Sequence, residues 1–221
     1  MLWWAVTGEP GEELTEKIFG IGFNKTGTTS LAAALEQLGY RVAPQPPAVR
    51  LFEEVFLRQE YRQLFAFCEE YDAFQDIPFG VPKVFRALDR HFPGSRFILT
   101  VRASADAWFD SLWRFLTKEY GERYGLPPAL EVMRSRPLGT DFIVYKAHCL
   151  VFEAEEYGLW NREHYQSIYE RHNQDVREYF RKRKSDFLEI EIGAPDAYAK
   201  LCTFLGHPSV QSRMPHLNKS G

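Results

Sequence analysis

The residues best suited to chemistry lie near the start of the chain, in Asn24-Lys25-Thr26-Gly27-Thr28-Thr29-Ser30. An apolar run, residues 18–23, precedes them, and a helical pattern follows over residues 28–38. A strand that turns through glycine into a helix brings the N–H groups of the turn and of the first helical turn to one point. The helix dipole makes that point positive. The stretch therefore predicts a phosphate-binding loop.

The individual side chains of this loop fit that interpretation. Lys25 adds a full positive charge, and Thr28, Thr29 and Ser30 add hydroxyl donors. Gly27 suits a position where the backbone approaches an anion or takes a positive φ. The order differs from the nucleotide-hydrolase pattern Gly-x-x-x-x-Gly-Lys-Ser/Thr, in which the lysine follows the second glycine. An ordinary strand-to-helix turn with chance threonines is the alternative.

Two further polar residues follow predicted strands. Arg102 comes directly after residues 96–101, the clearest buried strand of the sequence. The carboxyl ends of parallel strands face the ligand crevice, so Arg102 is expected near the loop, where its five N–H donors suit a phosphate; a structural ion pair is the alternative. Asp76 ends a short strand two residues before Pro78, a position that also suits a turn cap.

Short apolar segments that alternate with helical patterns must position these residues. This alternation predicts an α/β fold in which helices flank a central, mostly parallel sheet, as a single domain over residues 1–221. Residues 1–16 are expected to be a loosely attached lead-in, and residues 121–140 an irregular, mobile flap. The predicted strands are 18–23, 40–43, 73–79, 96–101 and 186–192, and the predicted helices are 28–38, 49–68, 82–91, 104–120, 141–156, 165–183 and 197–205.

Composition narrows the class of protein. A chain of 221 residues with 45% hydrophobic content can bury one core. The formal charge of -3 gives no basic field that would favour nucleic acid. Cys68, Cys149 and Cys202 form no close pair, which suits reduced thiols in the cytoplasm, and no apolar run reaches the roughly 20 residues that span a bilayer. The strand before Arg102 ends without an acidic metal ligand, so no metal is expected.

The loop and the strand that ends in Arg102 resemble parts of the sulfotransferases that use 3′-phosphoadenosine 5′-phosphosulfate (PAPS). That family has a 5′-phosphosulfate-binding loop of the form Pro-Lys-Ser/Thr-Gly-Thr-Thr, and Asn24 stands where many members carry proline or arginine. Residues 97–112 are similar to the family's 3′-phosphate segment, in which a serine follows the arginine on the next helix. Asp110 holds the usual position of that serine, and Ser111 comes one residue later.

The end of the chain extends the resemblance to residues 17–219. Phe204-Leu-Gly-His-Pro208 and the later Met214-Pro-His-Leu-Asn-Lys219 look like the family's terminal signature. The resemblance implies two groups of ligand-binding residues. Those implied for the 5′-phosphosulfate are Lys25, Thr26, Gly27, Thr28, Thr29 and Ser30, and those implied for the 3′-phosphate are Arg102, Ser111 and Lys219, with Asn218 beside it.

The resemblance also implies catalytic roles. Lys25 would stabilise the leaving oxygen. The cytosolic members carry a catalytic histidine in Lys-Thr-His-Leu-Pro, between the loop and the arginine strand, and Phe74-Gln-Asp-Ile-Pro78 places Asp76 at that position. Asp76 is therefore the implied base. His172 is the next residue to consider, although with Asn173 it fits a polar helix face.

The expected function follows from these implications. The donor would be PAPS, the product nucleotide adenosine 3′,5′-bisphosphate, and the acceptor a small molecule or carbohydrate, with no metal and no nucleic acid involved. The acceptor and the oligomeric state are not identified, and the absence of a membrane anchor suggests a cytoplasmic protein. A P-loop kinase that uses ATP and a non-catalytic nucleotide-binding member of the fold are the alternatives.

Overall fold

A parallel sheet of four strands organises the computed structural model, which describes residues 16–138, 142–209 and 213–215. The strands are β1 (Ile18–Gly20), β2 (Ala73–Phe74), β3 (Arg96–Val101) and β4 (Phe187–Glu191), in the order β2-β1-β3-β4. Ile18 pairs with Ala73 on one side and with Arg96 on the other. The predicted α/β fold with a parallel sheet is confirmed.

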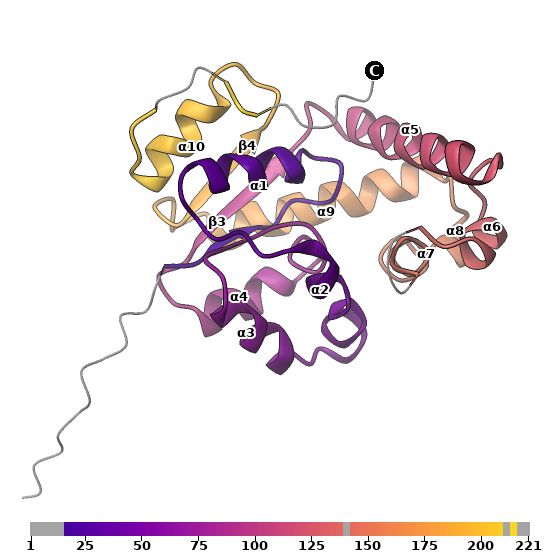
Figure 1. Cartoon of the computed structure of the whole chain (residues 1–221), viewed down its shortest axis with the longest axis horizontal. Coiled ribbons are helices and arrows are strands. Elements are labelled where there is room, and N and C mark those ends of the chain that lie inside the picture. Colours follow the sequence, from indigo (N-terminus) through magenta and orange to yellow (C-terminus); the bar gives the residue numbers. More distant parts are fainter. Residues whose placement is uncertain (1–15, 139–141, 210–212, 216–221) are drawn as a thin grey trace, which may run out of the picture.

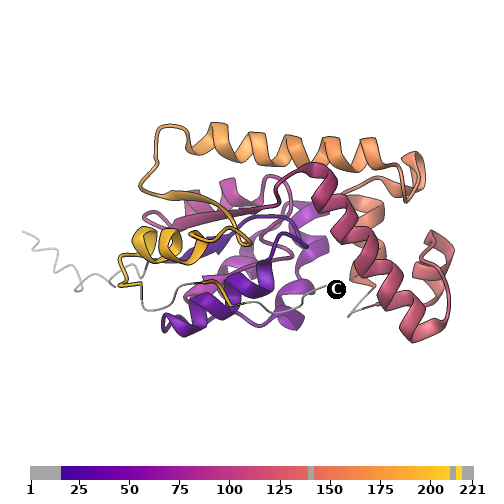
Figure 2. The same cartoon turned by 90° about the horizontal axis from the view of Figure 1, so that it is seen from above.

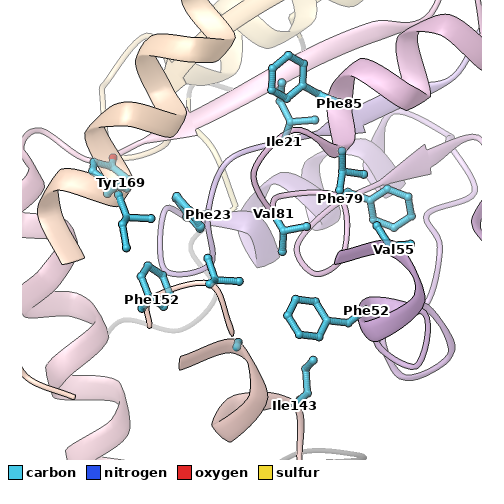
Figure 3. Packing of buried hydrophobic residues seen from close by; sticks show 14 of the residues in the cluster. Ile21, Phe23, Phe52, Val55, Phe79, Val81, Phe85, Ile143, Phe152 and Tyr169 are labelled. Atoms are coloured by element: carbon cyan, nitrogen blue, oxygen red, sulfur yellow. The ribbon is translucent and has the colours of Figure 1, made fainter. Parts of the chain in front are cut away.

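Alternation along the strands sends apolar side chains to both faces of the sheet, as a covered parallel sheet requires. Phe19 and Phe97 pack against one layer that includes α9, whereas Ile18 and Ile98 pack against α1 and α10. Figure 2 shows α9 along one side of the sheet and α1 with α10 along the other. Figure 3 shows part of the hydrophobic layer on the α9 side, in which Phe23 lies among Tyr169, Phe152 and Val81.

The helices follow the sheet in the order shown in Figure 1. Within the described residues, α1 and α10 are single helices as predicted, and α9 begins three residues earlier than predicted. The helical elements are α1 (Thr28–Gln37), α2 (Gln45–Val49), the short π-helical η1 (Glu54–Arg58), α3 (Arg62–Glu69), α4 (Val84–His91), α5 (Ala105–Tyr124), α6 (Leu130–Ser135), α7 (Ile143–Leu150), α8 (Ala154–Tyr157), α9 (Arg162–Phe180) and α10 (Ala197–Leu205).

Several local predictions are wrong. The expected strand at residues 40–43 is reduced to one bridge between Val42 and Ala73. The expected helix at residues 49–68 is divided, because Gln59 takes a positive φ of 54° that ends η1. The expected helix at residues 141–156 is likewise divided into α7 and α8 by Glu153, whose φ is 51°. Positive φ interrupts an α-helix, and neither position carries the glycine that would have signalled it.

The segment predicted to be an irregular flap is largely helical. Helix α5 continues through Gly121 to Tyr124 and ends at Gly125, where φ is 64°. Helix α6 follows, anchored by the buried side chain of Met133. The buried Tyr120 holds the end of α5 in place, so one internal glycine does not end the helix. Whether the segment moves stays a prediction.

Three remaining expectations concern the N-terminal lead-in, membrane-spanning segments and the cysteines. Residues 1–15 of the predicted lead-in lie outside the described residues. Among the helices that are described, none combines the length and the apolar character needed to cross a membrane. Cys68, Cys149 and Cys202 are all free thiols.

Candidate functional site

The predicted phosphate-binding loop lies between β1 and α1, and two glycines allow it to pack against the sheet. Gly27 has a φ of 100°, and a Cβ placed there would lie 2.8 Å from Ile192. A Cβ at Gly22 would lie 2.2 Å from the Oγ1 atom of Thr100 in β3. A larger residue at Gly22 would therefore force the loop away from β3, and one at Gly27 would clash with Ile192, directly after β4. Helix α1 begins directly after this turn, and Gly27 supplies no side chain to cap its first N–H groups.

The threonines of the loop have different environments. The Thr26 hydroxyl is buried, donates to the Phe23 carbonyl at 2.5 Å and lies 2.5 Å from the Thr100 hydroxyl. Its side chain therefore fixes the loop to β3. Thr28 and Ser30 are buried, whereas Thr29 is exposed. The resemblance treats these residues alike, but the structure gives Thr26 a positioning contact.

Asp76 lies against the first turn of α1. Its Oδ2 atom accepts a hydrogen bond from the Thr28 hydroxyl at 2.9 Å, and its Oδ1 atom accepts one from the Ile77 N–H at 2.9 Å. Burial raises the pKa of the Asp76 carboxyl, and these hydrogen bonds and the nearby Lys25 charge oppose that rise without cancelling it. The carboxyl is therefore a stronger base than an ordinary aspartate.

The Lys25 side chain, in the same loop, is partly buried. Its Nζ atom lies 3.9 Å from the centre of the Phe115 ring, within the range of a cation–π contact. Burial lowers the pKa of Lys25, the Asp76 carboxylate opposes this effect, and the Arg102 guanidinium adds to it. Lys25 and Asp76 both take positive φ values, 66° and 64°, which cost a non-glycine residue about 1–2 kcal/mol. Such backbone strain is common at functional sites.

Arg102 connects the loop to helix α5. Its Nε donates to the Lys25 carbonyl at 2.6 Å, and its Nη2 donates to the Ser111 hydroxyl at 3.3 Å. The buried Ser111 thus faces the arginine, as the resemblance implies, even though it comes one residue late. Asp110 points elsewhere and accepts from Arg162 at 2.6 Å.

Sequence reasoning missed one contact and one charge at this site. The indole N–H of Trp108 donates to the Asn24 carbonyl at 3.0 Å and ties α5 to the loop. Arg114 stands one helical turn beyond Ser111, and its charge lowers the pKa of Arg102, an effect second to burial. Helical spacing in residues 108–115 could have indicated that Ser111, Arg114 and Phe115 share one side of α5.

His172 and Asn173 do not form the polar helix face that the sequence suggested, because both are buried. The Nε2 atom of His172 lies 2.8 Å from the Ile21 carbonyl, which accepts a hydrogen bond from the imidazole N–H. Burial lowers the pKa of His172 to about 4. The neutral imidazole donates a hydrogen bond to the backbone directly before the loop. Because this nitrogen is a donor and the pKa is lowered, His172 is a poor alternative to Asp76 as the base.

A narrow pocket opens beside Asp76. Its walls come from the loop after β1, the turn after β2, and α7 with the residues that follow it. The pocket is lined by Phe23, Asn24, Asp76, Ile77, Gly80, Val81, Ala147, Val151 and Phe152. The amide oxygen of Asn24 is buried and has no hydrogen-bond partner within the described residues. Lys219 and Asn218, the remaining expected ligands, lie outside the described residues.

Comparison with known families agrees with this geometry. A model of a family described as a sulfotransferase domain matches residues 17–221, nearly the whole chain. The chain belongs to the sulfotransferase-domain family, and the predicted family is confirmed. Comparison with curated proteins finds none that matches it.

Proposed function

We propose that the chain transfers a sulfuryl group from PAPS to a hydroxyl or amine group of an acceptor. One observation supports this proposal above the others: the hydrogen bond from Arg102 to the Lys25 carbonyl joins two basic positions that the resemblance assigns to different phosphates. A nucleotide with phosphates on both its 5′ and 3′ positions would engage both. The proposal extends the sulfotransferase assignment to a particular donor.

The residues of the loop fit an anionic donor. Partial burial lowers the pKa of both Lys25 and Arg102, so their charged forms have lost part of their hydration. The first turn of α1 adds N–H groups that its cap residue leaves without a side-chain partner. An anion bound there gains hydrogen bonds and relieves the repulsion between the two cations. Lys25 to Ser30 would hold the phosphosulfate, and Arg102 with Ser111 would hold the 3′-phosphate.

The proposed reaction uses two residues of the chain. The donor supplies a sulfuryl group on a phosphate that leaves readily. Lys25 stabilises the charge that develops on the leaving oxygen, an electrostatic role typically worth about 10²–10³ in rate. Asp76 accepts the proton of the acceptor as a new S–O or S–N bond forms, and the electron pair of the broken S–O bond goes to the bisphosphate.

One observation keeps the ATP-dependent kinase as a second candidate. In P-loop nucleotide hydrolases, a loop Ser or Thr and an acidic residue together hold Mg²⁺. The hydrogen bond between Thr28 and Asp76 pairs the same two residue types. The lysine that precedes Gly27 and the arginine that follows β3 favour the sulfotransferase, because they differ from the kinase pattern at both places.

Nucleotide binding and metal dependence test the proposal. We expect adenosine 3′,5′-bisphosphate to stabilise the protein against heat much more than AMP does, and Arg102→Ala to remove most of that difference. Sulfation of an acceptor mixture, followed by mass spectrometry, should continue in EDTA. Equal stabilisation by the two nucleotides would contradict the 3′-phosphate site, and phosphoryl transfer from ATP that EDTA abolishes would favour the kinase.

A further inference from the structure

We propose that Phe115 is a positioning residue for Lys25, and that its ring holds the Lys25 ammonium group where it can meet the leaving oxygen of the donor. This inference rests on the proposed function, because it gives a residue of α5 a task in the transfer that Lys25 assists. Phe115 lies outside the loop and far from it in the sequence, so no motif of the loop includes it.

One face of α5 contacts the loop and the arginine beside it. Trp108 donates to the loop backbone at 3.0 Å, and Ser111 accepts from the Arg102 side chain at 3.3 Å. Phe115 continues this face one turn later, where its ring centre lies 3.9 Å from the Nζ atom of Lys25. Positions i, i+3 and i+7 share one side of an α-helix, so a single helix face makes all three contacts. The first two contacts hold α5 against the loop and thereby fix the place of the Phe115 ring.

Within the part of the chain that the structure describes, the Lys25 ammonium group has this ring contact but no hydrogen bond and no ion pair. Two carboxylates are close enough to act on Lys25 by charge, Asp76 from the turn after β2 and Glu119 from α5. Glu119 pairs with Arg123 at 3.5 Å instead. The ring therefore holds an ammonium group that neither carboxylate has captured.

A ring face suits this task better than a carboxylate would. The face of an aromatic ring attracts a cation through its quadrupole, and it leaves the three N–H donors of an ammonium group to stronger acceptors. A close ion pair with Asp76 or Glu119 would have to be broken before Lys25 could bind an anion, and its attraction would be lost. Contact with Phe115 keeps Lys25 in place without that loss.

Partial burial increases what the ring contributes. Burial lowers the pKa of Lys25, whereas the Asp76 and Glu119 charges oppose this effect and the Arg102 charge adds to it. Because a cation–π contact is stronger for a desolvated cation, the ring offsets part of the hydration that the charged lysine has lost. The contact thus favours the protonated form, which is the form that can stabilise a leaving oxygen.

The contact can be tested without turnover, by NMR of the unliganded protein. A methylene group above an aromatic ring resonates upfield, so the Cε protons of Lys25 should lie upfield of those of other lysines; Lys25→Arg identifies their signal by removing it. Phe115→Leu should abolish the upfield shift, and Phe115→Tyr should keep it. The matched control is Phe65→Leu, at a partly buried ring of α3 that stacks on His91 with ring centres 3.8 Å apart, and it should leave the signal unchanged.

A double-mutant cycle tests whether the contact contributes to transfer. In single-turnover reactions with PAPS and the acceptor mixture that tests the proposed function, Phe115→Leu should slow transfer about 2–30-fold, the range that one cation–π contact provides. Phe115→Tyr should restore most of the parental rate, and Phe65→Leu should keep it. In Lys25→Ala protein, Phe115→Leu should have almost no further effect on the rate or on the affinity for adenosine 3′,5′-bisphosphate, because Phe115 acts through Lys25.

Three results would overturn the inference. A Lys25 signal without an upfield shift in the parent protein would exclude the contact, and a parental transfer rate in Phe115→Leu would show that the contact has no role in transfer. Equal losses from Phe115→Leu with and without Lys25 would show that the ring acts independently, as a ring stacked on adenine would. A parent protein that transfers no sulfuryl group would instead contradict the proposed function, and the NMR shift would still decide whether Phe115 holds Lys25.

Discussion

Asp76→Asn is the substitution that most directly tests the proposed mechanism. The asparagine oxygen can accept from the Ile77 N–H, and the new amide can donate to the Thr28 hydroxyl, so both observed hydrogen bonds have a replacement. The side chain keeps its shape and loses only its ability to take a proton. Positioned proton transfer contributes about 10²–10⁴-fold to rate. We expect kcat to fall by that factor while the affinity for adenosine 3′,5′-bisphosphate changes little.

Although Asp76→Asn should lower kcat, it should not lower the free energy of unfolding. Because burial raises the pKa of Asp76 in the folded protein, the folded state binds more protons than the unfolded state between the unfolded and folded pKa values. The ionised carboxylate therefore lowers stability as the pH rises through that window, and this loss persists at neutral pH. Asparagine has no such ionisation, so urea unfolding at neutral pH should show Asp76→Asn to be at least as stable as the parent.

The control is Asp72→Asn, at the residue directly before β2. Asp72 pairs with Arg41 at 3.2 Å near the surface, and hydrogen bonds from Arg41 lower its pKa. Asp72→Asn should keep parental turnover. Because the pKa of Asp72 is lowered in the folded protein, its ionised carboxylate stabilises the fold, and any loss of stability in the variant should appear at pH values above the unfolded-state pKa. Near-parental kcat in Asp76→Asn would refute its role as base and leave it as a turn residue. A collapse of nucleotide affinity would show instead that Asp76 shapes the loop.

Three further predictions concern other parts of the site. Lys25→Ala should lower kcat by about 10²–10³ with little change in melting temperature, and activity within a few-fold of the parent would show that Lys25 does not face the transferred group. Ser111→Ala should weaken adenosine 3′,5′-bisphosphate in calorimetry while Asp110→Ala does not, because only Ser111 contacts Arg102; equal effects would contradict that contact. Amide hydrogen exchange in residues 121–138 should slow when nucleotide and acceptor bind, and exchange that ligands leave unchanged would exclude a moving flap.

The sequence predicted those parts of the fold that depend on local patterns. The loop, α1 and the strand before Arg102 each carry their signal within a few neighbouring residues. The divided helices were missed because Gln59 and Glu153 adopt positive φ without glycine, so only their tertiary surroundings determine the breaks. The continuation of α5 past Gly121 was missed for a related reason, since burial of Tyr120 outweighs the low helix propensity of one glycine.

For the candidate site, too, the sequence predicted some features and left others open. The sequence indicated Lys25, Asp76 and Arg102 because each follows a strand, and parallel strands bring such positions to one edge of the sheet. It left open whether burial or Lys25 controls the pKa of Asp76; burial does. It placed His172 on a polar face because helical spacing alone does not show that Phe23 packs against its ring, with ring centres 4.7 Å apart.

The electrostatics of the loop explain why this fold suits an anionic donor. The Arg102 side chain donates a hydrogen bond to the Lys25 carbonyl, which keeps these two residues together, and partial burial lowers the pKa of both. Asp76 does not neutralise them as a tight ion pair would, because its own pKa is raised and not lowered. The positive charges of Lys25 and Arg102 are therefore only weakly neutralised by the Asp76 carboxylate. Removing either charge should therefore weaken donor binding and turnover, while the stability of the unliganded protein stays the same or increases.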